Sequence, residues 1–89
     1  MQKIKFIITN NRLMWFIGVC EEGDFVDFEN YEPDYICSAL QITFERYNEI
    51  MVEIGAKQIN DFFWFRTEED AQKAIDDLEP YLIMERLIS

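Results

Sequence analysis

The sequence contains no histidine, so it lacks the side chain that proteins use most often as a catalytic base and metal ligand. Without histidine, neither a Ser–His nor a Cys–His catalytic pair can form. The only serines, Ser38 and Ser89, do not stand in a nucleophile motif. The three glycines, Gly18, Gly23 and Gly55, are too scattered for a phosphate-binding loop. These absences predict a protein that is not an enzyme.

Cysteine is also scarce. Cys20 and Cys37 are too few for a zinc site, and we expect buried, reduced thiols in a cytoplasmic protein rather than a disulfide. Carboxylates remain the only candidates for chemistry, either as a glycosidase-like pair or as a Mg²⁺ or Ca²⁺ site. Asp24, Asp27 and Glu29 are close in sequence but do not match the spacing of a calcium-binding loop. We therefore predict no metal and no cofactor.

Long apolar runs and positive charge are lacking as well. No run approaches the roughly 18 residues of a membrane span, and we expect no signal peptide and no membrane contact. The length predicts one domain, residues 1–89. Eight basic residues face 18 acidic ones, which gives a net charge of −10. Such a surface repels nucleic acid and attracts basic partners, although acidity can also serve only to keep a small protein monodisperse.

Aromatic residues are abundant and gather in the run Phe62-Phe63-Trp64-Phe65. Successive side chains of a strand point to opposite faces, so Phe62 and Trp64 should share one face and Phe63 and Phe65 the other. A strand with large apolar groups on both faces is normally covered on both sides. Either the chain's own helices close both sides, or another molecule closes one of them.

The order of apolar patterns predicts an α+β fold in which two helices pack on one face of a mainly antiparallel sheet. The N-terminal part should form a β-meander because three apolar runs alternate and are separated by turn residues. A period of three to four residues then predicts a long helix that Asp34 caps and Gly55 terminates. In order, the expected elements are strands at 3–9, 13–20 and 25–29, a helix at 34–54, an aromatic strand at 57–66, a helix from the Thr67 cap to Pro80, and a last strand at 81–88, for which a short helix is the alternative.

Two groups of carboxylates are candidate partner-binding residues. The first group lies in a segment without Lys or Arg and comprises Glu21, Glu22, Asp24, Asp27, Glu29, Glu32 and Asp34. The second group, Glu45, Glu49 and Glu53, repeats every four residues and should form a row on one helix face. Like charges at that spacing slightly destabilise a helix, so a row retained despite this cost is a candidate for function. It would mimic a run of phosphates and bind a basic nucleic-acid-binding channel. An ordinary solvated helix face is the alternative.

Three aromatic side chains, Phe16, Phe63 and Phe65, are candidates for partner binding or for a homodimer contact. If both helices cover one face of the sheet, the other face keeps large apolar groups, and such exposed patches usually mark an interface. A two-fold homodimer is the economical form of that interface. The alternative is that the C-terminal segment covers this face.

The segment Phe63-Trp64-Phe65-Arg66-Thr67-Glu68-Glu69-Asp70-Ala71 resembles a strand-to-helix junction that is common in small phage proteins. In size, acidity and order of elements, the chain resembles compact proteins encoded by phages and mobile elements, some of which inhibit host-defence nucleases as anti-CRISPR proteins do. The resemblance implies a stoichiometric inhibitor that occupies a basic site on a nuclease complex and binds no nucleic acid directly. The alternatives are a structural or regulatory homo-oligomer built through the aromatic sheet face, and a carboxylate-based metal enzyme.

Overall fold

A computed structural model describes residues 3–88 of the chain, with side chains described for residues 4–82. The N-terminal part is an antiparallel meander of β1 (Lys3–Asn11), β2 (Met14–Glu22) and β3 (Phe28–Asn30), with β2 in the centre. This confirms the predicted meander. The third strand, expected at 25–29, begins at Phe28 instead, and residues 24–27 form the loop before it. Aspartate at position 27 disfavours an extended strand, which is consistent with the later start.

The predicted single helix over 34–54 is wrong, because two helices occupy this region. They are α1 (Pro33–Leu40) and α2 (Phe44–Ile54). Gln41 ends α1 in the left-handed conformation, with φ of 56°. Thr43 then starts α2: its side-chain oxygen accepts a hydrogen bond from the Arg46 backbone N–H at 3.1 Å. Thr43, which lies inside the predicted helix, is therefore the cap of a second helix.

The N-terminus of α1 also differs from the prediction. Glu32, rather than Asp34, occupies the N-cap position and makes no side-chain capping bond, while Pro33 lies in the first turn. Proline is well suited there because its missing N–H would have no intrahelical partner. At the other end of this region, Gly55 terminates α2 in the left-handed conformation as predicted, with φ of 97°.

The predicted aromatic strand over 57–66 is a short hairpin of β4 (Lys57–Ile59) and β5 (Phe62–Trp64). Asn60 lies in the turn with φ of 55°, which asparagine tolerates better than most residues. Beyond β5, Phe65 joins the hairpin to the meander. Two backbone hydrogen bonds link Phe65 with Trp15, at 2.9 and 2.8 Å, on the same edge of β2 that β3 occupies further along.

The last element, α3 (Glu68–Ile88), extends through Pro80, so the prediction that Pro80 ends the helix and that 81–88 forms a strand is wrong. The predicted Thr67 cap is confirmed, because Thr67 Oγ1 accepts from the Asp70 backbone N–H at 3.1 Å. Pro80 lies on the exposed side of α3, where water can satisfy the carbonyl that proline leaves without a partner. Leu82 lies two residues after Pro80 and is only 6% exposed. Its burial in the core favours continuation of the helix beyond Pro80.

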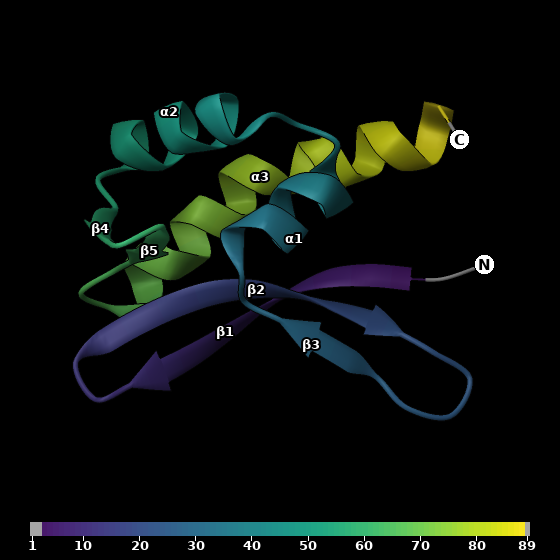
Figure 1. Ribbon diagram of the computed structural model, residues 1–89, viewed down its shortest axis with the longest axis horizontal. Coiled ribbons are helices and arrows are strands. Elements are labelled where there is room, and N and C mark those ends of the chain that lie inside the picture. The colour runs from purple at the N-terminus through teal and green to yellow at the C-terminus, as the bar shows by residue number, and fades with distance from the viewer. Residues whose placement is uncertain (1–2, 89) are drawn as a thin grey trace.

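The molecule has two layers, with all three helices on one side of the three-stranded sheet (Figure 1). This confirms the predicted α+β class and the packing of helices on one sheet face. The core lies between the layers and is apolar; its largest fully buried side chains are Tyr47, Ile36, Met51, Leu78 and Val19. Within residues 3–88, no helix is both long and apolar enough to cross a membrane.

Candidate functional site

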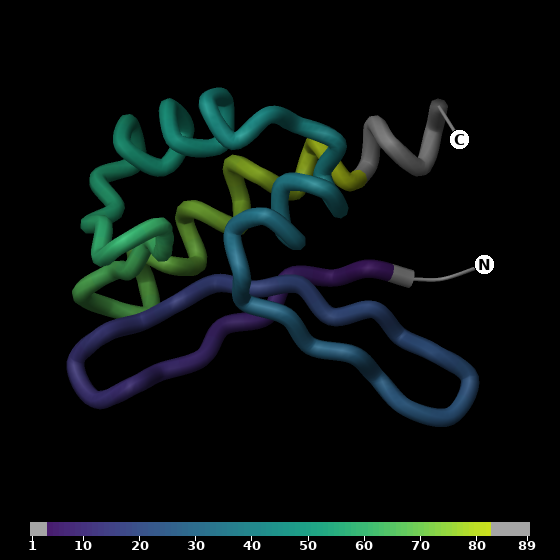
Figure 2. Tube along the Cα trace, viewed as in Figure 1, coloured from purple at the N-terminus to yellow at the C-terminus, as the bar shows by residue number. Residues whose placement is uncertain are grey.

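The connection from β2 to β3 carries Phe25, the most exposed large apolar side chain among the described residues. We call residues 21–30 the acidic hairpin. It projects at the end of the molecule opposite the β1–β2 turn (Figure 2). At its tip, Phe25 is 98% exposed and Val26 is 77% exposed. Neither side chain contributes to the core, so the hydrophobic effect of folding does not explain their presence.

Five carboxylates accompany this apolar tip, and the structure divides them into two groups. Glu21 accepts a hydrogen bond from the Tyr35 hydroxyl, and Glu22 pairs with Lys5 at 3.4 Å. The other three, Asp24, Asp27 and Glu29, form no ion pair with any residue that the structure describes. The negative charge next to the tip is therefore free to attract an external cation.

The carboxylates also gather around the buried Cys20 thiol. Burial raises the pKa of Cys20, and the neighbouring charges of Asp27, Glu29 and Glu22 raise it further, more than Lys5 lowers it. Cys37 is buried as well, with a pKa raised to about 11, chiefly by desolvation. Both thiols are free, as the sequence predicted, and both stay protonated at neutral pH. These thiols are poor nucleophiles and poor metal ligands.

The base of the hairpin is held to α1 by Tyr35. Its hydrogen bond to Glu21, followed by burial, raises the pKa of Tyr35 to about 12. Its ring also packs edge-to-face on Phe28, with the ring centroids 5.6 Å apart. The acidic hairpin is thus anchored at its base and free at its tip.

This anchor predicts a pH dependence. Because the Tyr35 pKa is raised from 10 to about 12 in the folded chain, its contribution to stability is complete below pH 10 and disappears as pH rises through 12. The difference in the free energy of unfolding between wild type and Tyr35→Phe should therefore shrink over this interval. Urea unfolding followed by tryptophan fluorescence measures it. A difference that stays constant from pH 10 to 12 would contradict the assigned hydrogen bond.

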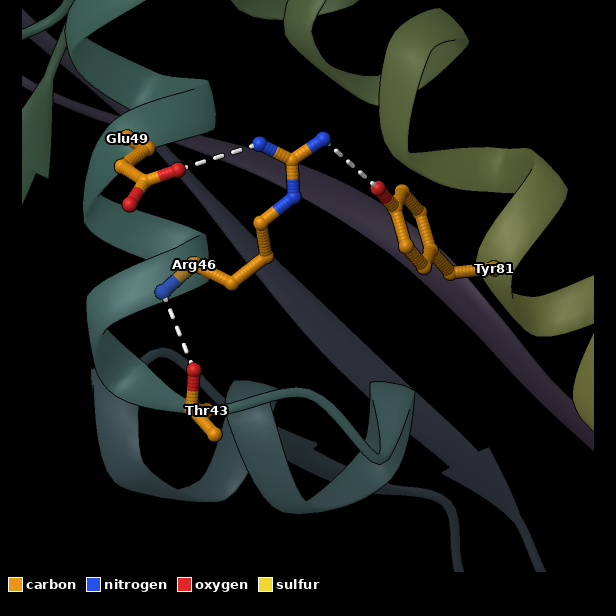
Figure 3. Close-up of polar contacts among 4 residues, drawn as sticks. All are labelled: Thr43, Arg46, Glu49 and Tyr81. Carbon is orange, nitrogen blue, oxygen red and sulfur yellow. Dashed lines mark hydrogen bonds and ion pairs between the residues drawn. The ribbon is translucent and has the colours of Figure 1, made fainter.

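The predicted row Glu45, Glu49 and Glu53 does lie on one helix, α2, and all three residues are exposed. The row is interrupted by cations. Arg46 pairs with Glu49 at 3.2 Å and also donates to the Tyr81 hydroxyl at 3.4 Å (Figure 3). Glu53 lines a cleft of about 500 Å³ between α2 and α3 together with Arg46 and Lys73. The row is therefore a poorer match for a run of phosphates than its spacing alone predicts.

The two predicted acidic groups do not form one surface. The tip of the acidic hairpin and α2 lie at diagonally opposite corners of the molecule (Figure 1). Glu32 and Asp34 lie between them, exposed at the start of α1. Of the ten predicted carboxylates, five lie in the hairpin that carries Phe25, which is 98% exposed: Glu21, Glu22, Asp24, Asp27 and Glu29. On α2, Glu45 and Glu53 adjoin the less exposed Phe44 and Val52.

The predicted aromatic contact is wrong for two of its three residues. Phe63 and Phe65 are 4% and 2% exposed and belong to the core, so neither can meet a partner. Phe63 instead packs edge-to-face on the buried ring of Tyr47. Phe16 is half-buried and lies on the opposite face of the sheet, away from the helices.

Phe25, Val26, Ile59 and Phe62 are among the exposed apolar side chains that sequence reasoning missed. Turn-forming residues in the sequence could have indicated that these side chains are exposed. Gly23-Asp24 shortens the third strand and leaves Phe25 in a loop. Asn60-Asp61 divides the predicted strand over 57–66 into a hairpin and places Ile59 and Phe62 on either side of its turn.

Within the described part of the chain, no three Cys, Asp or Glu side chains are placed to hold one metal ion. Comparison with protein-family models, curated proteins and solved structures found no match to this chain. The acidic hairpin has to be interpreted from its own geometry and charge.

Proposed function

We propose that this protein is a non-enzymatic binding protein whose acidic hairpin occupies a basic surface on another protein or on a protein–nucleic-acid complex. One observation carries the proposal: Phe25 is 98% exposed at the end of a projecting hairpin, next to carboxylates that form no ion pair with any described residue. Long-range attraction of the carboxylates to Lys and Arg would accelerate encounter. Burial of the aromatic ring would then supply binding energy at the centre of the contact.

The partner class that fits best is a nucleic-acid-binding channel, in which Lys and Arg side chains are concentrated. Such channels are built to neutralise phosphate charge, and Asp24, Asp27 and Glu29 offer them carboxylates instead. In this form of the proposal the protein is an inhibitor of the anti-CRISPR kind. Occupying the channel would exclude nucleic acid, and the protein itself, with a net charge of −10, would not bind nucleic acid.

The proposal is tested by placing a photo-crosslinking phenylalanine analogue at Phe25 and irradiating the full chain in a lysate of the source organism. The purified captured protein is then titrated with wild type. We expect affinity to fall several-fold with added salt and about tenfold, or 1.4 kcal/mol, in Asp24→Asn/Asp27→Asn. Glu45→Gln/Glu53→Gln removes the same charge from α2 and should change affinity little.

Three results would contradict the proposal. The first is crosslinking from a site on α2 but not from position 25. The second is equal loss of affinity in the two charge-matched double variants, which would indicate net charge rather than the hairpin. The third, which concerns only the inhibitor form, is binding of nucleic acid by the captured protein that is unaffected by a saturating amount of this chain.

A further inference from the structure

The three-stranded sheet has one face that no helix covers. The pairing of β1 with β2 places Ile8 opposite Ile17 and Phe6 opposite Val19, and these residues face the helices. Alternation therefore sends the neighbouring residues, including Thr9 and Phe16, to the other face. All three helices lie on the side of the core, and the outward face of the sheet has no helix over it (Figure 1).

A groove of about 410 Å³ lies on this outward face, and we call it the sheet groove. Its lining contains no charged residue and consists of Thr9, Asn11, Met14, Phe16, Tyr31, Ile59, Asn60 and Phe62. Phe16 and Tyr31 are half-buried, whereas Phe62 and Ile59 are 37% and 48% exposed. The β4–β5 hairpin thus forms an apolar ridge along one side of the groove.

The position of Phe62 follows from the bridge between Phe65 and Trp15. Since Trp15 and Phe65 pair directly and Phe65 is in the core, alternation along β5 places Phe63 inward and Phe62 outward, beside Phe16. The groove and the ridge are therefore fixed to the same β2 edge. A face that carries an apolar ridge beside an apolar groove presents both of the elements that a two-fold contact between copies would pair.

Charge distinguishes this face from the rest of the surface. Two copies with a net charge of −10 repel each other, so association costs least where carboxylates are absent from the contact. The described lining of the groove satisfies this, while Asp61 stands outside the lining, between Asn60 and Phe62 in the turn of the β4–β5 hairpin. Among the residues whose side chains are described, the charged ones on the three strands of this face are Lys5, Glu22 and Glu29, and they stand at the other end, near the acidic hairpin. An uncharged groove also gives a charged partner nothing to recognise electrostatically.

We propose that a second copy of this chain covers the sheet groove in a two-fold homodimer, with the Phe62 and Ile59 ridge of each copy packed over Phe16 of the other. The contact buries apolar groups that the monomer leaves in water. It leaves both acidic hairpins at the outer ends of the dimer, because they project from the opposite end of the sheet (Figure 2). The inference does not depend on what the hairpins bind.

Sedimentation equilibrium of the full chain tests the proposal. We expect a reversible monomer–dimer equilibrium whose dissociation constant decreases between about 0.05 and 0.5 M NaCl, because the Debye length falls from roughly 14 to 4 Å and the repulsion is screened. This sign is opposite to the one expected for hairpin binding, so the two proposals can fail separately. A chain that stays monomeric at all concentrations, or a dimer that salt dissociates, would overturn the homodimer.

Two matched variants locate the contact. Phe62→Glu should raise the dimer dissociation constant at least tenfold, while Phe44→Glu should leave it unchanged. Phe44 has nearly the same exposure, 36% against 37%, but lies at the start of α2 on the helical side. Ile59→Asp is a second variant, with circular dichroism confirming that each folds. If Phe62→Glu dimerised with the same dissociation constant as wild type, this face would be excluded as the contact. If the wild-type chain were monomeric and its groove bound an apolar dye, the groove would be assigned to a small ligand instead.

Discussion

Phe63→Ala should lower the free energy of unfolding by about 3–5 kcal/mol, the loss typical of a large aromatic side chain removed from a core. Phe63 is 4% exposed and its ring meets the Tyr47 ring edge-to-face, with centroids 5.6 Å apart. Small domains have a total stability of roughly 5–15 kcal/mol, so the variant should lose a large part of it. Urea unfolding monitored by the fluorescence of Trp15 and Trp64 measures the loss.

The adjacent residue is the matched control. Phe62→Ala removes the same side chain from the same strand, but Phe62 is 37% exposed and points away from the core. At protein concentrations at which the chain is monomeric, we expect a loss of about 1 kcal/mol or less, as for surface positions. Equal losses at positions 62 and 63 would contradict the orientation of β5. In that case the sheet groove would also have a different lining.

Gly18→Ala should destabilise the chain by about 1–3 kcal/mol, the range for forcing an extra carbon into a packed site. A Cβ at this position would lie 2.4 Å from Cδ1 of Tyr31 and 2.7 Å from the carbonyl oxygen of Asn30. The tyrosine ring can move, but the carbonyl belongs to β3 and is held by pairing with β2. The sign of this change in the free energy of unfolding is informative. In an unobstructed strand, replacing glycine with alanine would stabilise the protein by about 0.5–1 kcal/mol.

A double-mutant cycle separates the two contacts of Gly18. In the Tyr31→Ala background the ring clash is gone and only the Asn30 carbonyl remains, so the cost of Gly18→Ala should be smaller there than in wild type. Urea unfolding of the four proteins gives the coupling energy. If Gly18→Ala were as stable as wild type or more stable, β3 could not approach β2 as closely as described.

Local sequence patterns were sufficient to predict an element where only one structural preference applied to the residues concerned. Alternating apolar residues predicted β1 and β2, and the left-handed Gly55 and the Thr67 cap were predicted within their own turns. Local rules failed where two of them competed. Thr43 lies within the helix that the apolar period predicted over 34–54, but its side chain caps α2, and Gln41 ends α1 in the left-handed conformation two residues earlier.

The candidate site was predicted only in part. All five hairpin carboxylates were identified from a segment without basic residues, because charge can be counted along a chain. The apolar tip was missed, since Phe25 and Val26 have high strand propensity and their exposure depends on where β3 begins to pair. The separation of the hairpin from the α2 row is a property of the tertiary structure alone (Figure 1).

By itself, the sequence determined the absence of imidazole chemistry, the excess of negative charge, and which aromatic side chains share a face of the strand. It could not determine which of the two faces is buried, because Phe62-Phe63-Trp64-Phe65 is equally apolar on both. That choice was made by a long-range contact, the pairing of Phe65 with Trp15, which turns Phe63 and Phe65 to the core and leaves Phe62 outside. Alternation relates neighbours to one another, whereas burial depends on what packs against them from elsewhere in the chain.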